Sequence, residues 1–281
     1  MHLSSYKVEF KLTRTKAAMN KLSIEDRVLI LNCLSEGLGI NGTARMTGKS
    51  KNTVLKLLAD VGQACALYQD RVMNNLQCER IECDEIWSFV GAKQRNVNPD
   101  KEAHADYGDC YTFTAIDPVS KLMPCWLVGQ RTPEATEDFM NDLAHRFAKR
   151  IQLTTDGWGA YRLAVDMAFG GAVDYAVVNK TYAPGFPVVE AKRRYSPAPF
   201  VKCTKEVVLG QPAKSLISTS LVERANLSMR MGMRRFTRLT NSFSKKLENH
   251  MHAVSFYFMV YNFVKIHGSM NRPGFSGGSN L

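Results

Sequence analysis

The sequence predicts a mixed α/β domain preceded by a small all-α domain. Apolar residues recur at helical spacing from Ser23 to about residue 62. From Ile81 onward, short apolar runs typical of strands alternate with helical segments. The 281 residues suffice for a small module and one larger domain. We expect a basic flexible arm at 1–20, an all-α domain at 21–62, a helical connector at 63–79, the α/β domain at 80–268 and a flexible tail at 269–281.

The small domain has the layout of a helix-turn-helix. Ser23 is placed to cap a first helix, and Gly37 and Gly39 interrupt the pattern. A short segment at 41–46 then leads through a glycine turn to Ser50, which is placed to cap a helix with a polar start. This layout is typical of DNA-binding domains, although a plain three-helix bundle with a solvated basic face has the same pattern. The residues expected to face a DNA groove are Lys51, Asn52, Thr53 and Lys56.

The larger domain is predicted from the order of its elements. It begins with three strands, and Asp117-Pro118 marks the turn between the second and third. A helix capped by Thr132, a strand ending at Asp156, a short helix and a further strand at 175–179 follow. A basic, irregular insertion at 182–215 precedes two helices, at about 221–235 and 245–264. This order resembles a ribonuclease H-like α/β fold with a mixed sheet.

Charge and composition narrow the functional classes. The net charge of +11 indicates a polyanionic partner, for which nucleic acid is the common case and an anionic membrane surface the rarer one. No uninterrupted apolar stretch reaches the roughly 18 residues of a membrane span, and no secretory signal pattern opens the chain, so we expect a cytoplasmic protein. The seven cysteines include no Cys-x-x-Cys pair, so no zinc is expected. The histidines do not cluster, and His250 and His252 are expected at the surface.

Asp84 is the first candidate site residue, because it lies inside an apolar run where an unpaired charge is costly. It needs a metal ion, an exposed strand edge, or a structural partner such as Arg80 or Lys93. By strand alternation Glu82 shares its face and Glu85 lies on the opposite one.

Two further carboxylates have local alternatives of their own. Asp156 closes an apolar run before Gly157, and Asp-Gly is also a common turn signal. Glu223 opens a helix rich in Arg and Met, and Ser220 to Glu223 also matches a capping box. Together with Asp84 they form the set that two divalent ions need for phosphoryl transfer: one carboxylate within a strand, one at a strand end and one on a helix.

Three motifs in this order resemble the transposases of the insertion sequence 1 family. They are residues 84–93, the segment Thr155-Asp156-Gly157-Trp158 with Tyr161, and the helix from Glu223 to Arg230 followed by Ser242 to Lys245. The stretch 39–58 is similar to the helix-turn-helix of that family. The resemblance covers most of the chain outside the N-terminal arm and the 182–215 insertion, but the family's cysteine-rich zinc segment has no counterpart here.

The resemblance implies a ribonuclease H-like enzyme with an Asp-Asp-Glu triad, in which Asp84, Asp156 and Glu223 bind two Mg²⁺ or Mn²⁺ ions. Such an enzyme nicks the ends of an insertion sequence and transfers them to target DNA. The partners it implies are double-stranded DNA and further copies of the chain on the DNA ends, with no membrane and a nucleoid-associated location. A DNA-binding repressor or decoy with an inactive catalytic domain, and a nuclease without strand transfer, are the alternatives. The remaining candidate DNA contacts, for which a solvated or salt-bridged surface is the alternative, are Lys93, Arg224, Asn226, Arg230, Arg234 and Lys245.

Overall fold

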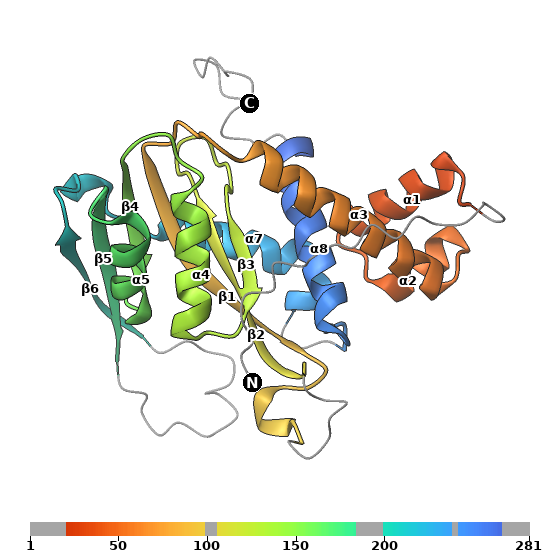
Figure 1. The fold of residues 1–281 in the computed structure, drawn as a ribbon. Coiled ribbons are helices and arrows are strands. Elements are labelled where there is room, and N and C mark those ends of the chain that lie inside the picture. Colours follow the sequence, from red (N-terminus) through yellow and green to blue (C-terminus); the bar gives the residue numbers. More distant parts are fainter. Residues whose placement is uncertain (1–20, 99–105, 184–198, 238–240, 266–281) are drawn as a thin grey trace.

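A six-stranded mixed sheet forms the centre of the protein, with helices on both faces and a helical N-terminal unit at one side (Figure 1). The computed structural model describes residues 21–98, 106–183, 199–237 and 241–265. The expected arm at 1–20, the tail at 269–281 and residues 184–198 of the expected insertion lie outside these ranges. None of the helices in these ranges has both the length and the apolar character required to span a bilayer.

The sheet order places the ends of the parallel strands beside the middle of β1. The order is β3-β2-β1-β4-β5-β6, with β1 parallel to β4, β4 parallel to β5, and the remaining pairs antiparallel. Pairing of β1 with β4 ends at Glu82 and Thr154, so Asp156 comes level with Asp84. The strands are β1 (Arg80–Val90), β2 (Gly108–Ile116), β3 (Trp126–Gly129), β4 (Ile151–Asp156), β5 (Val173–Tyr182) and β6 (Phe200–Leu209).

Three helices form the N-terminal unit: α1 (Ile24–Ser35), α2 (Ile40–Thr47) and α3 (Lys51–Val72). The predicted caps are present, because Ser23 Oγ accepts from the backbone N–H of Asp26 and Ser50 Oγ from that of Thr53, each at 3.1 Å. Helix α3 continues past residue 62 without a break, so much of the connector expected at 63–79 belongs to the same helix as Lys51.

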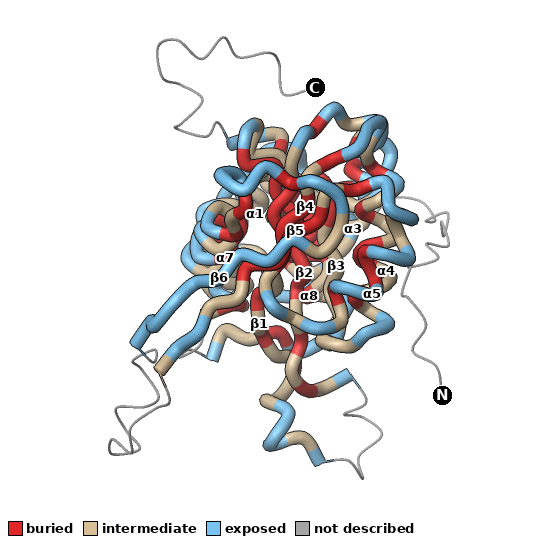
Figure 2. Tube along the Cα trace, turned by 90° about the vertical axis from the view of Figure 1, so that its left-hand side faces the viewer, coloured by how far each residue is buried: buried red, intermediate tan, exposed pale blue. Residues whose placement is uncertain are grey.

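Two helical layers cover the sheet. Helices α4 (Pro133–Ala144) and α5 (Ala160–Phe169) pack on one face around Phe113 and Phe139. Helices α7 (Ser220–Gly232) and α8 (Leu247–Met259), the latter continued by the π-helix η5 (Val260–Val264), cover the other face around Ile86 and Phe258. Figure 2 shows the buried residues concentrated in the sheet and on the inner sides of these helices. Single 3₁₀ turns are η1 (Gln94–Asn96), η3 (Lys214–Leu216) and η4 (Arg234–Phe236).

Two expectations from the sequence are wrong. Residues 200–209 are not irregular but form the edge strand β6, since antiparallel pairing with β5 orders this β-branched stretch. His250 and His252 are not at the surface, with 0% and 8% exposure, because α8 is covered by other elements. Burial lowers the pKa of His250 to about 3, so the ring is neutral, and its Nδ1 lies 2.8 Å from Ser244 Oγ.

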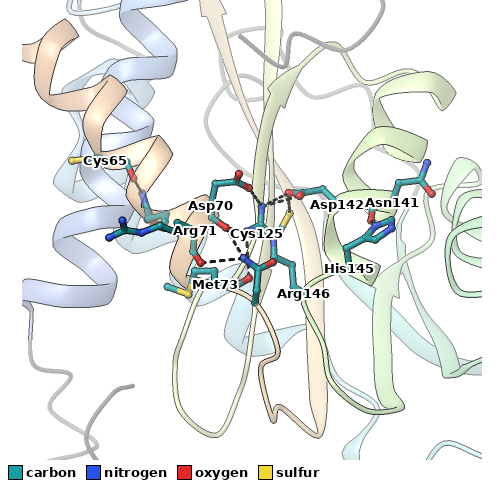
Figure 3. A network of polar contacts seen from close by, with 11 residues as sticks. Cys65, Asp70, Arg71, Met73, Cys125, Asn141, Asp142, His145 and Arg146 are labelled. Carbon is teal, nitrogen blue, oxygen red and sulfur yellow. Dashed lines mark hydrogen bonds and ion pairs between the residues drawn. The ribbon is translucent and has the colours of Figure 1, made fainter. Parts of the chain in front are cut away.

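Arg146 joins the end of α3 to the end of α4 (Figure 3). Its guanidinium Nη2 donates to Asp70 Oδ1 at 2.9 Å and to Asp142 Oδ1 at 2.7 Å. Its Nη1 donates to the backbone carbonyls of Asp70 and Met73, both at 3.3 Å. The side chain is only 8% exposed, so these hydrogen bonds replace the hydration that it gives up on folding.

Replacing Arg146 by Met should therefore lower the free energy of unfolding by roughly 2–4 kcal/mol, because the carbonyls and carboxylates are left without a buried donor. Urea denaturation followed by circular dichroism measures the change. The matched control is Lys149→Met, which removes a pair with Glu79 at 3.6 Å between exposed groups and should cost less than about 1 kcal/mol. Equal destabilisation of the two variants would show that Arg146 does not anchor α3.

Candidate active site

A polar pocket lies where β4 and β5 end against β1 and the start of α7. The carboxylates predicted as metal ligands, Asp84, Asp156 and Glu223, all line it. The remaining wall consists of Arg131, Gly157, Trp158, Val178, Asn179, Lys180, Tyr182 and Thr219. The fold therefore brings residues from three distant motifs to one place.

Asp84 is held by Asn226 of α7. The Asn226 amide Nδ2 donates to Asp84 Oδ2 at 2.9 Å, and its Oδ1 accepts from Thr114 Oγ1 at 3.0 Å. Asn226 is 6% exposed, so it orients Asp84 from the interior and offers little surface for the DNA contact that the sequence suggested. Within the described residues, neither Arg80 nor Lys93 forms an ion pair with Asp84, so those structural alternatives are not realised.

Glu85 is the site residue that sequence reasoning missed. Carboxylate oxygens of Asp84, Glu85 and Asp156 all lie within 4.8 Å of one another. Alternation predicts Glu85 on the face of the sheet opposite Asp84. However, β1 continues beyond its last pair with β4, so side chains from both faces of β1 lie next to the end of β4. The adjacent acidic pair Asp84-Glu85 was the available signal.

Arg131 bridges two of these acids. Its Nη2 lies 3.1 Å from Glu85 Oε2 and 3.4 Å from Asp156 Oδ2, and its guanidinium lies 4.3 Å from the centre of the Trp158 ring. Asp156 also forms the turn that the Asp-Gly pair indicates, since its Oδ1 accepts from the backbone N–H of Trp158 at 3.0 Å. Gly157 leaves room for Asn179, whose Oδ1 would clash with any Cβ at this position.

Burial and mutual repulsion alter the proton affinity of this group. Burial, with a smaller contribution from Asp156, raises the pKa of Asp84 to about 6 and that of Glu85 to about 7. The Glu85 side chain is 3% exposed, and its interaction with the Tyr161 hydroxyl acts against the rise in its pKa. Clustered carboxylate oxygens fit a hard divalent cation.

Glu223 occupies the pocket wall opposite this cluster. Its carboxylate pairs with Lys180 Nζ and accepts from Thr219 Oγ1 at 2.6 Å. The alternative capping box is not formed, since the backbone N–H of Ser220 donates to Ser218 Oγ and that of Glu223 to the Thr219 carbonyl.

Glu82 caps this helix instead. Its Oε2 accepts from the backbone N–H groups of Leu221 at 2.8 Å and Val222 at 3.2 Å. Glu82 is 3% exposed and shares the face of Asp84, as alternation predicts. The start of α7 is thus fixed directly to β1, which leaves the Glu223 side chain in the pocket.

The predicted DNA contacts lie in three other places, and their roles stay predictions. On α3, Lys51, Asn52 and Lys56 are exposed, while the Thr53 hydroxyl lies 2.8 Å from Ser50 Oγ. Beyond the pocket, Lys93 lies over the rings of Trp87 and Phe89 and Lys245 over Phe243, and the two phenylalanine rings are 4.7 Å apart. On and after α7, Arg224 and Arg234 are exposed and Arg230 is half-buried.

The raised pKa values have a consequence for stability. The folded protein binds protons at Asp84 and Glu85 more tightly than the unfolded chain, so without metal these groups should reduce stability as pH rises from about 4 through 7. Glu85→Gln should therefore raise the free energy of unfolding relative to wild type at pH above 7, by on the order of 2 kcal/mol, and should give a smaller difference at pH 5. Thermal denaturation in chelator across this range measures it, and Mg²⁺ should reduce the difference.

Glu79→Gln is the matched control for this experiment, because Glu79 is 82% exposed and should show no comparable change. A Glu85→Gln variant that is less stable than wild type at high pH would contradict the assigned cost of the Glu85 charge.

Comparison with known proteins adds little to what the pocket shows. No known family model matches the sequence, and no curated protein matches it. Among solved structures, the piggyBac transposase synaptic complex with hairpin DNA is similar with a TM-score of 0.37 and 11% identity, over 90% of this chain and 69% of that one. A pre-cleavage Mos1 transpososome is similar with a TM-score of 0.23 and 10% identity, over 90% and 82% of the two chains. Membership of the insertion sequence 1 family stays a prediction, and the functional argument rests on the pocket.

Proposed function

We propose that this chain is a metal-dependent DNA transposase of the Asp-Asp-Glu type with a ribonuclease H-like catalytic domain. The observation that carries the proposal is the pocket, where three carboxylates taken from separate sequence motifs lie together in a strongly basic protein. The sheet order, with two parallel pairs between antiparallel edges, supports the proposed fold.

Asp84, Asp156 and Glu223 would hold two Mg²⁺ or Mn²⁺ ions, with Glu85 next to them. When bound, such ions neutralise charge on the reacting phosphate and lower the pKa of bound water. The protein's own residues prepare the site: Asn226 orients Asp84, Arg131 balances Glu85 and Asp156, and Lys180 keeps the Glu223 carboxylate at the wall.

The DNA substrate would be held mainly by the positive charge of the chain. We propose that α1 to α3 act as a helix-turn-helix that recognises the element ends, with the exposed start of α3 in the groove. Two ends must be brought together for transposition, so the active form on DNA is proposed to contain more than one copy of the chain.

Removing any of the three proposed ligands should abolish strand cleavage. We expect Asp84→Asn, Asp156→Asn and Glu223→Gln each to reduce the cleavage rate about a thousandfold or more, while DNA affinity changes little. The assay uses labelled duplexes carrying the genomic sequence on each side of the coding region, with Mg²⁺ or Mn²⁺. Glu85→Gln should slow cleavage without abolishing it, and Glu79→Gln should leave it unchanged.

The products of this assay also separate the alternatives. Cleavage retained in one variant removes that residue from the triad, and inactivity of Glu85→Gln with retained activity of Glu223→Gln would exchange those two roles. Cleaved ends without joined product indicate a nuclease. Wild-type binding without cleavage indicates a repressor or decoy.

The proposed recognition helix gives a separate prediction. The double variant Lys51→Ala, Lys56→Ala should bind the same duplexes more weakly, and the slope of log affinity against log salt should fall by about 0.9 for each phosphate that the variant no longer neutralises. Fluorescence anisotropy across a salt series measures both quantities. Lys149→Ala, at the opposite end of β4 from the pocket, is the control; equal effects would indicate only a general charge contribution.

A further inference from the structure

The ends of β5 and β6 leave the sheet together as a two-stranded ribbon. β5 pairs with β4 only as far as Val178 in the described sheet, and its residues Asn179–Tyr182 pair with β6 alone. We define the β5–β6 ribbon as residues 179–182 and 200–205. Asn179 and Lys180 are half-buried and the remaining residues of the ribbon are exposed, and Figure 2 shows this part projecting from the buried core.

The β5–β6 ribbon carries aromatic side chains in water. Tyr182 and Phe200 are 49% and 58% exposed, and their rings meet edge to face with centroids 6.1 Å apart. Every β6 residue from Phe200 to Val207 is exposed, so internal packing does not explain the two rings. Exposed rings beside lysines are the features with which proteins stack on unpaired bases.

The charge of the β5–β6 ribbon suits a nucleic-acid strand. Lys202 and Lys205 are exposed and form no ion pair with any residue the structure describes. The neighbouring acid, Glu206, is balanced by Arg162 at 2.6 Å. Two lysines on an edge strand also oppose pairing with the same strand of a second copy.

The β5–β6 ribbon is continuous with the acidic pocket. Asn179, Lys180 and Tyr182 line that pocket together with Asp84 and Asp156. A nucleic-acid strand with a phosphate between Asp84 and Asp156 would therefore pass beside Tyr182, which lines the same pocket, and its ring partner Phe200.

We propose that the β5–β6 ribbon binds a single-stranded stretch of DNA next to the phosphodiester in the pocket, with bases against Tyr182 and Phe200 and phosphates near Lys205, which pairs with the pocket residue Val178 and shares its face. A single strand is required because the bases of an intact duplex already stack on one another and leave no face for the rings. The position of this strand rests on the proposed function, whereas its binding needs neither metal nor cleavage.

The test measures binding of a fluorescein-labelled thymidine oligonucleotide of about 20 nucleotides, and of a duplex of equal length, by anisotropy in chelator. The double variant Tyr182→Leu, Phe200→Leu removes the rings but keeps apolar bulk, and should weaken single-strand binding at least about fivefold per ring with a smaller effect on duplex. Lys205→Gln should lower the single-strand salt slope by about 0.7 for each phosphate that is no longer neutralised, whereas Lys202→Gln, on the opposite face of β6, should lower it less. Leu163→Ala on α5, 65% exposed, is the matched control and should bind as wild type.

Unchanged single-strand affinity in the ring variant overturns the proposal, and so does an equal weakening for single strand and duplex. A ring variant that changes the sedimentation of the DNA-free protein assigns the β5–β6 ribbon to an interface between copies, which also overturns it. A ring effect without any cleavage by wild type refutes the proposed function alone, and cleavage without a ring effect refutes this inference alone.

Discussion

The buried carboxylate of Glu82 fixes the relation between the sheet and α7, and the rest of the site depends on it. A carboxylate at a helix start satisfies free backbone N–H groups and meets the positive end of the helix dipole. Burial raises the pKa of Glu82, while the two backbone donors act against that rise. Because this cap joins β1 to α7, Asn226 one turn further along reaches Asp84, and Glu223 faces the pocket.

The charge balance of the pocket follows from this arrangement. Three carboxylates line it, Asp84, Asp156 and Glu223, and Glu85 lies beside them; Arg131 and Lys180 are the cations that oppose this group. Above the pKa values of Asp84 and Glu85, this leaves a local excess of negative charge inside a protein of net charge +11. In the proposed function, this excess attracts a divalent cation and the surrounding basic surface attracts DNA, so negative charge lies in the pocket and positive charge around it.

Local rules predicted much of this structure, and the failures share one cause. The caps at Ser23, Ser50 and Thr132 depend only on neighbouring residues, and all are present. Asp84, Asp156 and Glu223 were singled out from their local sequence contexts and from the resemblance to a transposase family, and all three line one pocket. Alternation correctly placed Glu85 on the face opposite Asp84, toward Tyr161 of α5, but it could not show that both faces of β1 meet at the end of β4.

The role of Glu82 escaped prediction because it depends on a helix more than a hundred residues away in the chain. The burial of His250 escaped prediction because it depends on the elements packed around α8. The capping-box sequence pattern correctly marked the start of α7, but the side chain that caps this helix is Glu82 of β1. Sequence patterns therefore located the chemical groups, whereas their partners were decided by tertiary packing.

The continuity of α3 has a mechanical consequence for the proposed function, in which the protein holds DNA at one place and acts on it at another. The helix that begins with the exposed Lys51 turn ends at the buried Arg146 side chain, so no linker separates the two regions. The helical unit also touches α7, since a Cβ on Gly37, at φ 81°, would lie 2.7 Å from the Gly232 carbonyl oxygen. DNA bound at the start of α3 would therefore lie at a fixed distance from the pocket, and the reacting phosphate would be selected by geometry as well as by sequence.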